Sequence, residues 1–324
     1  MYLIGLIHWP HNSRGGEGRR GRPYVYSPTV ILRCFVVRIW FRLDSNRALH
    51  EYLAMEMPYN KKVMRVCGLS RIPNRRTFDR RLATISNDIK NRITTMGKLF
   101  VHEKIIDPSI LSTDSTLIKA KGHVWHKSSM KKKVVPYSGI DTDAMWGFSH
   151  TKGWIFGYKL HLISSTDSII VPLAVDFTTA NIPDNHMYSI LTASLPVTMI
   201  KRTLYMSADP GYDDHELYDL STDMGFQLVC PVKRYRNTPS DRIKLVEFYE
   251  SDIGQTIYSL RSISIEPLIE HIKSVFRIDP LHVRGYAKTC ATVLLSVLLY
   301  QILVYYNCKT RKDNPRAIKY MLGT

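Results

Sequence analysis

Apolar residues in the first third of the chain recur at intervals of three and four positions. This spacing runs through Ile31, Cys34 and Phe35 and is resumed at Leu49. Because positions three and four apart lie on one face of an α-helix, the pattern predicts amphipathic helices that pack on one another. We therefore expect a small all-helical region from Pro28 to about residue 100.

One segment of this helical region has the pattern of a helix-turn-helix. Residues 67–82 predict the end of one helix, a turn, and a second helix that begins near Asn74 or Thr77. Arginine supplies both phosphate and base-edge contacts, so the segment fits a DNA-binding helix, although a solvated helix face would explain the same charges without DNA. The arginines that we expect to contact DNA here are Arg75, Arg76, Arg80 and Arg81.

The hydrophobic period changes after about Glu103, where polar and apolar residues begin to alternate as they do in strands. The predicted elements are strands at 110–118, 157–164 and 169–177, a helix from Asp184, a strand at 203–208, a helix at 213–223, a strand at 226–232 and a helix from about Ile265. Three strands followed by alternating helices and strands is the order of a ribonuclease H-like α/β domain with a mixed sheet. The chain thus divides into a flexible basic tail (1–27), a helical DNA-binding domain (28–100) and a ribonuclease H-like domain (101–324).

The charge balance of the chain favours a polyanionic partner. The 324 residues include 45 Lys and Arg against 28 Asp and Glu, which gives a formal net charge of +17. Such an excess favours nucleic acid as the partner over an acidic small molecule, although many basic proteins carry it for solubility alone. Charge alone therefore does not assign a function, and the positions of the basic residues have to support it.

Two basic segments lie outside the predicted helix-turn-helix. Residues 14–23 are rich in Gly and Arg and predict a flexible arm, in which Arg20 and Arg22 resemble residues that follow the DNA minor groove. Residues 127–133 hold four lysines in a long connection after the first predicted strand. Either segment can bind DNA, and either can equally be a solvated stretch of charge.

The segment 289–306 is the strongest indication of a different class of protein. It has eighteen residues without a charge, close to the minimum for a membrane span. Ser296 and Gln301 interrupt it, and no second such segment accompanies it, so we expect a buried helix covering the sheet and no membrane. The five cysteines include no C-x-x-C pair, which indicates neither a disulfide framework nor a zinc ribbon and fits a cytoplasmic, nucleoid-associated protein.

Three carboxylates stand at positions that need a chemical reason. Asp114 lies inside an apolar strand, where an anion is costly unless a cation compensates it. Asp209 ends a strand and precedes Pro210, at the edge of the sheet where α/β domains place ligands; it can alternatively cap the turn that follows. Glu266 is expected in the first turn of the late helix, with Ser264 as N-cap, and Glu270 one turn later is its rival as the third acid.

Several short phrases around these acids resemble one known family. They are Ser112-Thr113-Asp114-Ser115-Thr116, Gly157-Tyr158-Lys159-Leu160-His161, Ala208-Asp209-Pro210-Gly211-Tyr212-Asp213 and Ile265-Glu266, with Tyr258, Arg261 and Lys273 around the last acid. Together they are similar to the Asp-Asp-Glu signature of insertion-sequence transposases, especially the family usually numbered five. The family pattern puts three residues between its Arg and Glu, whereas four separate Arg261 from Glu266 here, and the helix start can absorb the extra one.

The resemblance implies a Mg²⁺-dependent (or Mn²⁺-dependent) DNA strand transferase and endonuclease. It would use two ions held by Asp114, Asp209 and Glu266 to cut double-stranded DNA at the ends of its element and to join the freed 3′-hydroxyl to target DNA. It further implies that Lys273 contacts a phosphate near the cut, that Tyr258 and Arg261 position the strand, and that a homodimer forms on DNA. The alternatives are a catalytically inactive DNA-binding descendant and a nuclease without joining activity.

Overall fold

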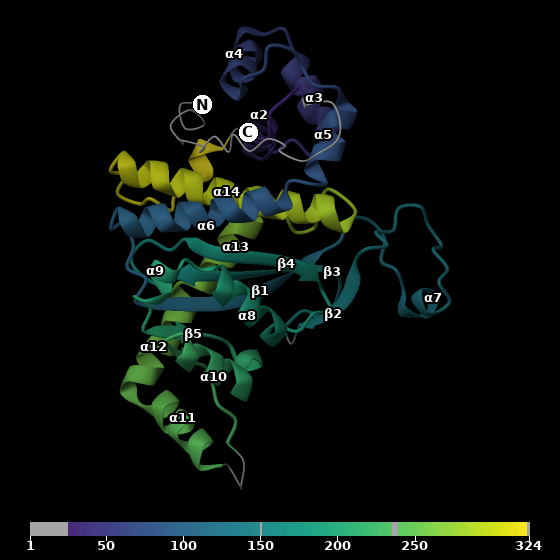
Figure 1. The fold of residues 1–324 in the computed structure, drawn as a ribbon. Coiled ribbons are helices and arrows are strands. Elements are labelled where there is room, and N and C mark those ends of the chain that lie inside the picture. Colours follow the sequence, from purple (N-terminus) through teal and green to yellow (C-terminus); the bar gives the residue numbers. More distant parts are fainter. Residues whose placement is uncertain (1–24, 150, 235–238, 323–324) are drawn as a thin grey trace, which may run out of the picture.

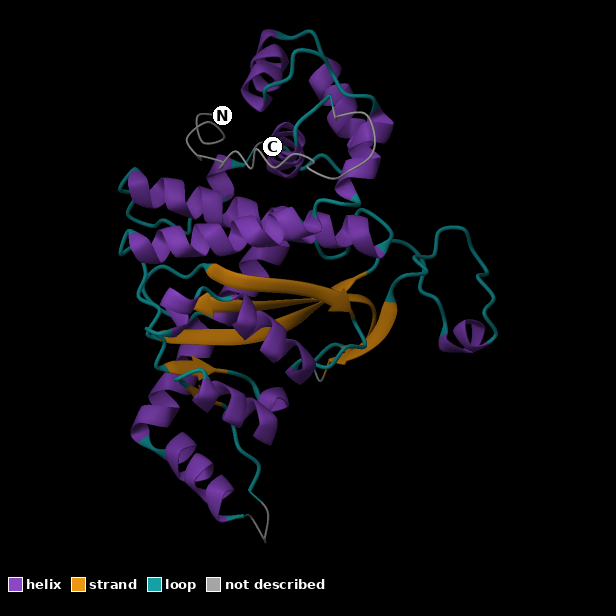
Figure 2. Ribbon diagram, viewed as in Figure 1, coloured by secondary structure: helices purple, strands orange, loops and turns teal. Residues whose placement is uncertain are grey.

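The chain folds into a cluster of helices placed on top of a sheet that is itself covered by helices (Figure 1). The computed structural model describes residues 25–149, 151–234 and 239–322. Figure 2 shows that the strands gather in one sheet and that the cluster on top of it is helical. Arg20 and Arg22, with most of the predicted tail, lie outside the described residues.

Four short helices form the N-terminal cluster, and local capping explains where they begin and end. Ser27 caps the first helix and accepts a hydrogen bond from the Val30 amide, while Gly68 ends the third helix in a left-handed conformation with φ of 83°. Asn74 caps the fourth helix, so the start predicted near Asn74 is confirmed. The helices are α2 (Pro28–Trp40), α3 (Asn46–Ala54), α4 (Pro58–Cys67) and α5 (Arg75–Leu82).

A buried polar network fixes three of these helices to one another. Arg38 of α2 is 1% exposed, donates to the Leu43 carbonyl at 3.2 Å and donates to Asn46 Oδ1 at 3.3 Å. Asn46 in turn donates to Asp79 Oδ1 of α5 at 2.8 Å. Burial lowers the pKa of Arg38 to about 10, so the guanidinium stays charged at neutral pH. The network sets the direction in which α5 presents its arginines.

The sheet has the mixed topology expected of a ribonuclease H-like domain. Its strands are β1 (Ile110–Lys119), β2 (Met145–Ser149), β3 (Gly153–Ser165), β4 (Pro172–Thr179), β5 (Tyr205–Ser207) and β6 (Gln227–Val229). β3 pairs antiparallel with β1 on one side and with β2 and β4 on the other, whereas β1, β5 and β6 run parallel. The predicted fold class is confirmed, but β2 is an additional early strand that the sequence pattern did not reveal.

Helices lie on both faces of this sheet. They are α6 (Ser86–His102), α8 (Asn185–Ser194), α9 (Val197–Ile200), α10 (His215–Asp223), α11 (Ser240–Glu250), α12 (Asp252–Ile263), α13 (Ile265–Phe276) and α14 (Tyr286–Lys309), with short 3-10 turns η1 (Pro210–Tyr212) and η2 (Lys319–Met321). α13 packs on β1 and β3, α8 packs on β3 and β4, and α6 lies along β4 and α14 (Figure 1). α6 thus belongs to the layer over the sheet, although most of it precedes the boundary predicted at residue 100. That boundary stays a prediction.

α14 is the hydrophobic segment that resembled a membrane span. Within the described residues it is the one helix long and apolar enough to cross a membrane, and 89% of its most apolar window is buried inside the protein. It contacts α6, α2, α13 and β4. The structure therefore shows the buried helix that the sequence predicts at this position.

Gln301 is the polar residue that fixes α14 in place. Its side chain is fully buried, and its Nε2 donates to the Ile93 carbonyl of α6 at 3.0 Å and to the Pro172 carbonyl of β4 at 2.7 Å. One amide group thus joins three elements from distant parts of the chain. Without this donor, two buried carbonyl groups would lose a hydrogen bond, which is costly.

We predict that Gln301→Met lowers the free energy of unfolding by about 1 to 3 kcal/mol, because both carbonyls lose this donor. Urea unfolding followed by circular dichroism measures the change. The matched control is Gln255→Met, which removes an exposed amide that donates to the Tyr249 carbonyl and should cost less than about 0.5 kcal/mol. Equal costs for the two variants would contradict the structural role of Gln301.

Candidate active site

The candidate site lies where β1 extends beyond its parallel neighbour β5. β1 pairs with β5 only as far as Ser112, opposite Ser207, so β1 continues past the carboxyl end of β5. Asp114 lies on this stretch, which pairs with β3 but not with β5, and Asp209 follows two residues after the end of β5. The two acids, ninety-five positions apart in the chain, are therefore brought to the same open edge of the sheet, which is where α/β folds place ligands.

Arg261 joins two of the predicted carboxylates. It lies in the last turn of α12 and is 7% exposed. Its Nη2 donates to Asp114 Oδ2 at 2.8 Å, and its Nη1 lies 3.6 Å from Glu266 Oε1. The sequence expectation that the buried Asp114 needs a cationic partner is thereby met by a residue 147 positions away.

The charges in this cluster do not balance fully. Burial raises the pKa of Asp114 to about 6, Arg261 opposes the rise, and Asp209 adds to it. Burial also raises the pKa of Asp209, again against the effect of Arg261. For Arg261 the penalty of burial is more than offset by Asp114 and Asp209, so its pKa is raised. One guanidinium therefore leaves the two aspartates short of positive charge.

Asp209 also has the turn-capping role that the sequence left open as an alternative. Its Oδ1 accepts a hydrogen bond from the Gly211 amide at 2.9 Å, at the start of η1. A carboxylate has further lone pairs, so one oxygen can hold the turn while the group still faces a ligand. The two interpretations of Asp209 are compatible.

A break between α12 and α13 separates Arg261 from Glu266. α12 ends at Ile263, Ser264 adopts φ of −112° and ψ of −85°, and α13 begins at Ile265. Ser264 occupies the N-cap position of α13, as expected, but its side chain makes no capping hydrogen bond, because its Oγ donates back to the Leu260 carbonyl of α12 at 2.5 Å. Glu266 lies in the first turn of α13, as expected; that the kink absorbs the extra residue stays a prediction.

Glu266 and Glu270 face different partners. The Glu266 side chain is 51% exposed and approaches Arg261, which also holds Asp114. Glu270 lies 3.7 Å from Lys273 Nζ and 3.8 Å from Lys152 Nζ. Of the two glutamates, Glu266 is thus the one that shares a partner with Asp114.

Lys273 is held inside the protein. It is 6% exposed, and its Nζ lies 3.0 Å from Asp279 Oδ2 and 3.3 Å from both Thr116 Oγ1 and the Leu117 carbonyl oxygen. Tyr258, the other expected DNA contact on α12, is half-buried, with its ring 5.9 Å from the Arg261 guanidinium. These contacts join α12 and α13 to β1 around the carboxylates.

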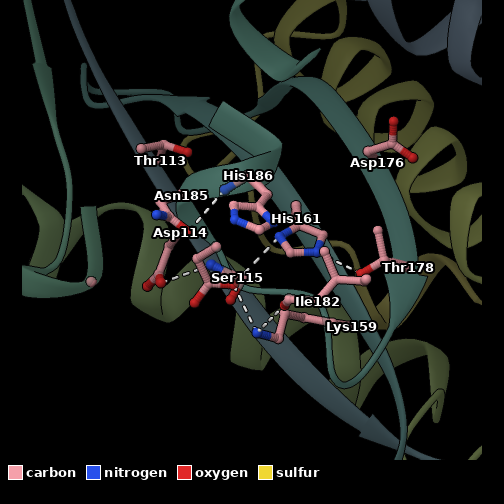
Figure 3. A network of polar contacts seen from close by, with 12 residues as sticks. Thr113, Asp114, Ser115, Lys159, His161, Asp176, Thr178, Ile182, Asn185 and His186 are labelled. Atoms are coloured by element: carbon pink, nitrogen blue, oxygen red, sulfur yellow. Dashed lines mark hydrogen bonds and ion pairs between the residues drawn. The ribbon is translucent and has the colours of Figure 1, made fainter. Parts of the chain in front are cut away.

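A second polar cluster, which the sequence analysis missed, lies beside the site (Figure 3). Lys159 Nζ donates to Asp184 Oδ1 and to the Ile182 carbonyl, each at 2.9 Å, and His161 Nε2 is 2.8 Å from Thr178 Oγ1. Burial lowers the pKa of His161 to about 4, so its imidazole is neutral at neutral pH, and its 3.5 Å approach to Asp184 is not an ion pair.

This cluster influences the candidate site electrostatically. Proximity of Asp184 raises the pKa of Asp209, and Lys159 opposes that rise, although burial remains the larger cause. The signal in the sequence was the alternation of Lys159 and His161 with apolar residues along one strand. The sequence alone could not show that both side chains point to the face of the sheet on which Asp184 precedes α8.

The donor chemistry of the site fits a hard divalent cation. Such ions prefer carboxylate oxygens, and Asp114 keeps a raised pKa even with a guanidinium beside it, which indicates that further positive charge would stabilise the ionised acids. Among the described residues, no three or more His, Cys, Asp or Glu side chains are grouped closely enough to form a metal site. In the arrangement described, Arg261 provides the positive charge between Asp114 and Glu266.

Three of the four arginines predicted to contact DNA are exposed on α5. Arg75, Arg76 and Arg80 face solvent, whereas Arg81 is half-buried and donates to the Tyr26 carbonyl at 3.2 Å. Arg81 thus has a structural contact that the sequence did not reveal. The contact of these arginines with DNA stays a prediction.

Comparison with known proteins identifies the family of the sheet region. A family model described as "Transposase DDE domain" matches residues 106–302, which include all three predicted carboxylates. The chain belongs to the transposase DDE domain family. No curated protein matches the sequence.

Two solved structures are similar to this transposase-family chain at low levels. The piggyBac transposase synaptic complex with hairpin DNA has 10% identity over 99% of this chain and 73% of that chain, with a TM-score of 0.40. The pre-cleavage Mos1 transpososome has 10% identity over 89% of this chain and 99% of that chain, with a TM-score of 0.23. The family assignment rests on the family model and not on these similarities.

The raised pKa of Asp114 predicts a pH dependence of stability. The folded protein binds a proton at this carboxyl more tightly than the unfolded chain does, since the pKa rises from 3.8 to about 6. The resulting stabilisation is present below pH 4 and is lost as the pH rises through about 6, at a cost of about 3 kcal/mol. In EDTA, the stability of Asp114→Asn relative to wild type should therefore improve by about this amount from pH 4 to pH 7.

Urea unfolding at a series of pH values measures this difference. Ser115→Ala is the matched control, because it keeps the backbone amide that donates to Asp114 Oδ1 and removes no titrating group. Its curve should run parallel to that of the wild type. A parallel curve for Asp114→Asn as well would show that Asp114 does not titrate in this range.

Proposed function

We propose that this protein is an active transposase that cuts and rejoins double-stranded DNA at the ends of its own element, as a member of the insertion-sequence group usually numbered five. The observation that carries the proposal is the position of Asp114, Asp209 and Glu266. Two acids meet at the open edge of β1, and Arg261 bridges Asp114 to the third. The family match over residues 106–302 supports the same class of chemistry.

Asp114, Asp209 and Glu266 are the residues that would hold the divalent ions, Mg²⁺ or Mn²⁺. Bound there, two such ions would supply charge stabilisation to the attacking and leaving oxygens of a phosphodiester. The protein's own contribution is to align the carboxylates: Arg261 favours the ionised form of Asp114 and holds Glu266 close to the same guanidinium. The rigid attachment of α12 and α13 to β1 keeps these acids at fixed positions relative to the strand.

The reaction would take place in two displacements. In the first, a water oxygen bonds to phosphorus and the P–O3′ bond breaks, which leaves a 3′-hydroxyl and a 5′-phosphate. In the second, that 3′-oxygen bonds to a phosphorus of the target strand and displaces the target's own 3′-oxygen. Neither step needs a covalent bond to the protein, in agreement with a site that presents acids and no activated nucleophile.

We expect Mg²⁺-dependent cleavage and joining of a labelled duplex that carries the element's end. Asp114→Asn, Asp209→Asn and Glu266→Gln should each reduce both products by at least about a hundredfold, because each removes a metal-holding oxygen, while DNA binding in EDTA persists. Gel analysis of cleaved and joined strands measures the effect. Glu270→Gln is the matched control, since Glu270 pairs with Lys273 and Lys152 and not with Arg261, which holds Asp114.

The outcomes separate the candidate functions. Cleavage without joining would favour a related nuclease, and binding without cleavage under any condition would favour a DNA-binding descendant that has lost activity. If Glu270→Gln abolishes the reaction and Glu266→Gln does not, the third carboxylate is Glu270. Activity in EDTA would contradict the metal-dependent mechanism altogether.

We further propose that the helical cluster recognises the element ends through α5 and that two copies assemble on DNA. Arg75, Arg76 and Arg80 are exposed on one helix whose direction is set by the Arg38 network. Exposed arginines on a helix that follows a turn can contact phosphates and base edges in the major groove. Two ends have to be brought together in transposition, which favours a dimer in the DNA complex.

Replacing Arg75, Arg76 and Arg80 with Gln should weaken binding to the element end at least about tenfold and reduce the slope of log affinity against log salt by about 2 to 3. The matched control replaces three exposed lysines outside the helical cluster, Lys98, Lys201 and Lys319, with Gln. Fluorescence anisotropy over a range of salt concentrations measures both quantities. Identical losses in the two triple variants would attribute the effect to net charge and not to α5.

A further inference from the structure

A basic arm extends from the sheet between β1 and β2 (Figure 1). We define the basic arm as residues 121–139, which include the short helix α7 (Lys127–Lys131). The arm carries five lysines and no acidic residue. All five lysines are exposed. Its positive charge is therefore not neutralised from within the arm.

The base of the arm is attached to the protein at both ends. Lys121 Nζ donates to the His282 carbonyl at 2.7 Å, and Arg284 Nη1 donates to the Ser138 carbonyl at 2.7 Å. Trp125 Nε1 donates across the arm to the Val134 carbonyl at 2.8 Å. Hydrogen bonds at its base and across its width give the arm a defined shape.

An exposed aromatic pair lies next to the arm. Phe148 at the end of β2 and Trp154 at the start of β3 are 52% and 58% exposed, and their ring centroids are 5.3 Å apart. We call these two residues, with Lys152 between them, the hairpin tip. Lys127 Nζ of the arm lies 3.2 Å from the Trp154 ring centroid. The cation of the arm and the indole of the hairpin tip thus form one surface.

This surface continues to the candidate active site. Lys152 Nζ lies 3.8 Å from Glu270 Oε1, and Glu270 Oε1 lies 3.7 Å from Lys273 Nζ. Lys273 and Glu266 belong to the same helix, α13, which packs on β1 beside Asp114. The two contacts of Glu270 therefore place the hairpin tip beside α13, the helix that carries Glu266.

We propose that the basic arm and the hairpin tip form a second DNA-binding surface, which holds a strand leaving the active site by its phosphates and stacks an unpaired base on Trp154. The proposal rests on the proposed function for the kind of nucleic acid involved. Lysines without acidic neighbours bind a phosphate backbone, and an exposed indole offers a face for a base. A paired duplex presents no free base face along its length, so the aromatic pair favours a strand that is cut, gapped or distorted.

A second copy of this chain is the alternative occupant, and the charges disfavour it. The protein has a formal net charge of +17, so docking its most basic projection onto another copy brings like charges together. DNA supplies the complementary charge. The exposed aromatic rings are equally well covered by a base.

The test compares two DNA probes of the same arbitrary sequence in EDTA, where no cleavage takes place. One is an intact duplex, and the other has a short single-stranded gap that contains 2-aminopurine. Wild type should bind the gapped probe more tightly and quench the 2-aminopurine. Trp154→Ala should bind the gapped probe about tenfold more weakly and lose the quenching, with little change for the intact duplex, whereas Trp154→Phe should keep most of the preference.

The contribution of the arm is measured with Lys127, Lys131 and Lys132 replaced by Gln. This variant should bind both probes more weakly than the Lys98, Lys201 and Lys319 control variant and should reduce the salt slope by about 2. Thermal melting by circular dichroism checks that each variant is folded. A Trp154→Ala variant that binds and quenches like wild type, or arm and control variants with equal affinities, would overturn the proposal.

Sedimentation in the absence of DNA provides a further decisive outcome. If Trp154→Ala converts a dimer into a monomer and leaves DNA affinity unchanged, the surface is a protein interface and the proposal is wrong. Because these measurements need no catalysis, they stay distinct from the test of the proposed function. Loss of cleavage in the carboxylate variants says nothing about the arm, and loss of stacking in Trp154→Ala says nothing about the carboxylates.

Discussion

The contact between Asp114 and Arg261 is the constraint from which the architecture of the site follows. A carboxylate in the middle of β1 is costly to bury, and a partner with five N–H donors on a planar group is well suited to compensate it. Arg261 reaches Asp114 from the last turn of α12, so α12 has to end over the part of β1 that extends beyond β5. The kink at Ser264 then directs α13 along β1 and β3, which places Glu266 beside the same guanidinium.

This arrangement also explains why Lys273 is buried. Once α13 runs along β1, the Lys273 side chain, about two turns from the helix start, meets Thr116 and Leu117 of the strand and Asp279 beyond the helix. An ammonium group at this depth needs several oxygen partners, and it has them. The ion pairs of Arg261 and Lys273 therefore act together, because each fixes one end of the α12–α13 unit to the strand that carries Asp114.

The sequence predicted the elements whose periodicity is long and regular, and it missed those defined by partners. β1, α8, α10, α13 and α14 lie close to where the apolar pattern places them: α8, α10 and α13 each bury one face, and α14 is buried along most of its uncharged run. β2 is short, contains Gly147 and pairs only with the first residues of β3, so its few positions show no alternation. α11 has almost no apolar face for a pattern to reveal. The roles of Lys159 and Asp184 were missed because their meeting depends on which face of β3 turns toward α8.

For the site, sequence indicated which residues need partners and structure indicated which partners they have. A buried anion at Asp114 was inferable from one strand, whereas its pairing with Arg261 depends on the kink at Ser264, which no local pattern predicts. The resemblance brought Arg261 and Lys273 to notice as DNA contacts. In the structure both are paired with acids, Arg261 with Asp114 and Lys273 with Asp279, so a phosphate that reaches them has to compete with those acids or arrive with cations that replace them.

The distribution of charge over the protein affects how a phosphate could approach these acids. A chain of net charge +17 has basic residues exposed on α5 and along the arm, yet the edge of β1 collects Asp114, Asp209, Asp184 and Glu266. DNA, the proposed partner, would be attracted to the basic periphery by long-range electrostatics and repelled from the carboxylates at which the proposed reaction would break bonds. Burial raises the pKa of Asp114 to about 6 despite Arg261, so added positive charge would stabilise the ionised acids. The same acids would repel an approaching phosphate. Divalent cations bound there would stabilise the ionised acids and would also reduce their repulsion of the phosphate. An acidic site in a basic protein is therefore consistent with the proposed metal-dependent reaction.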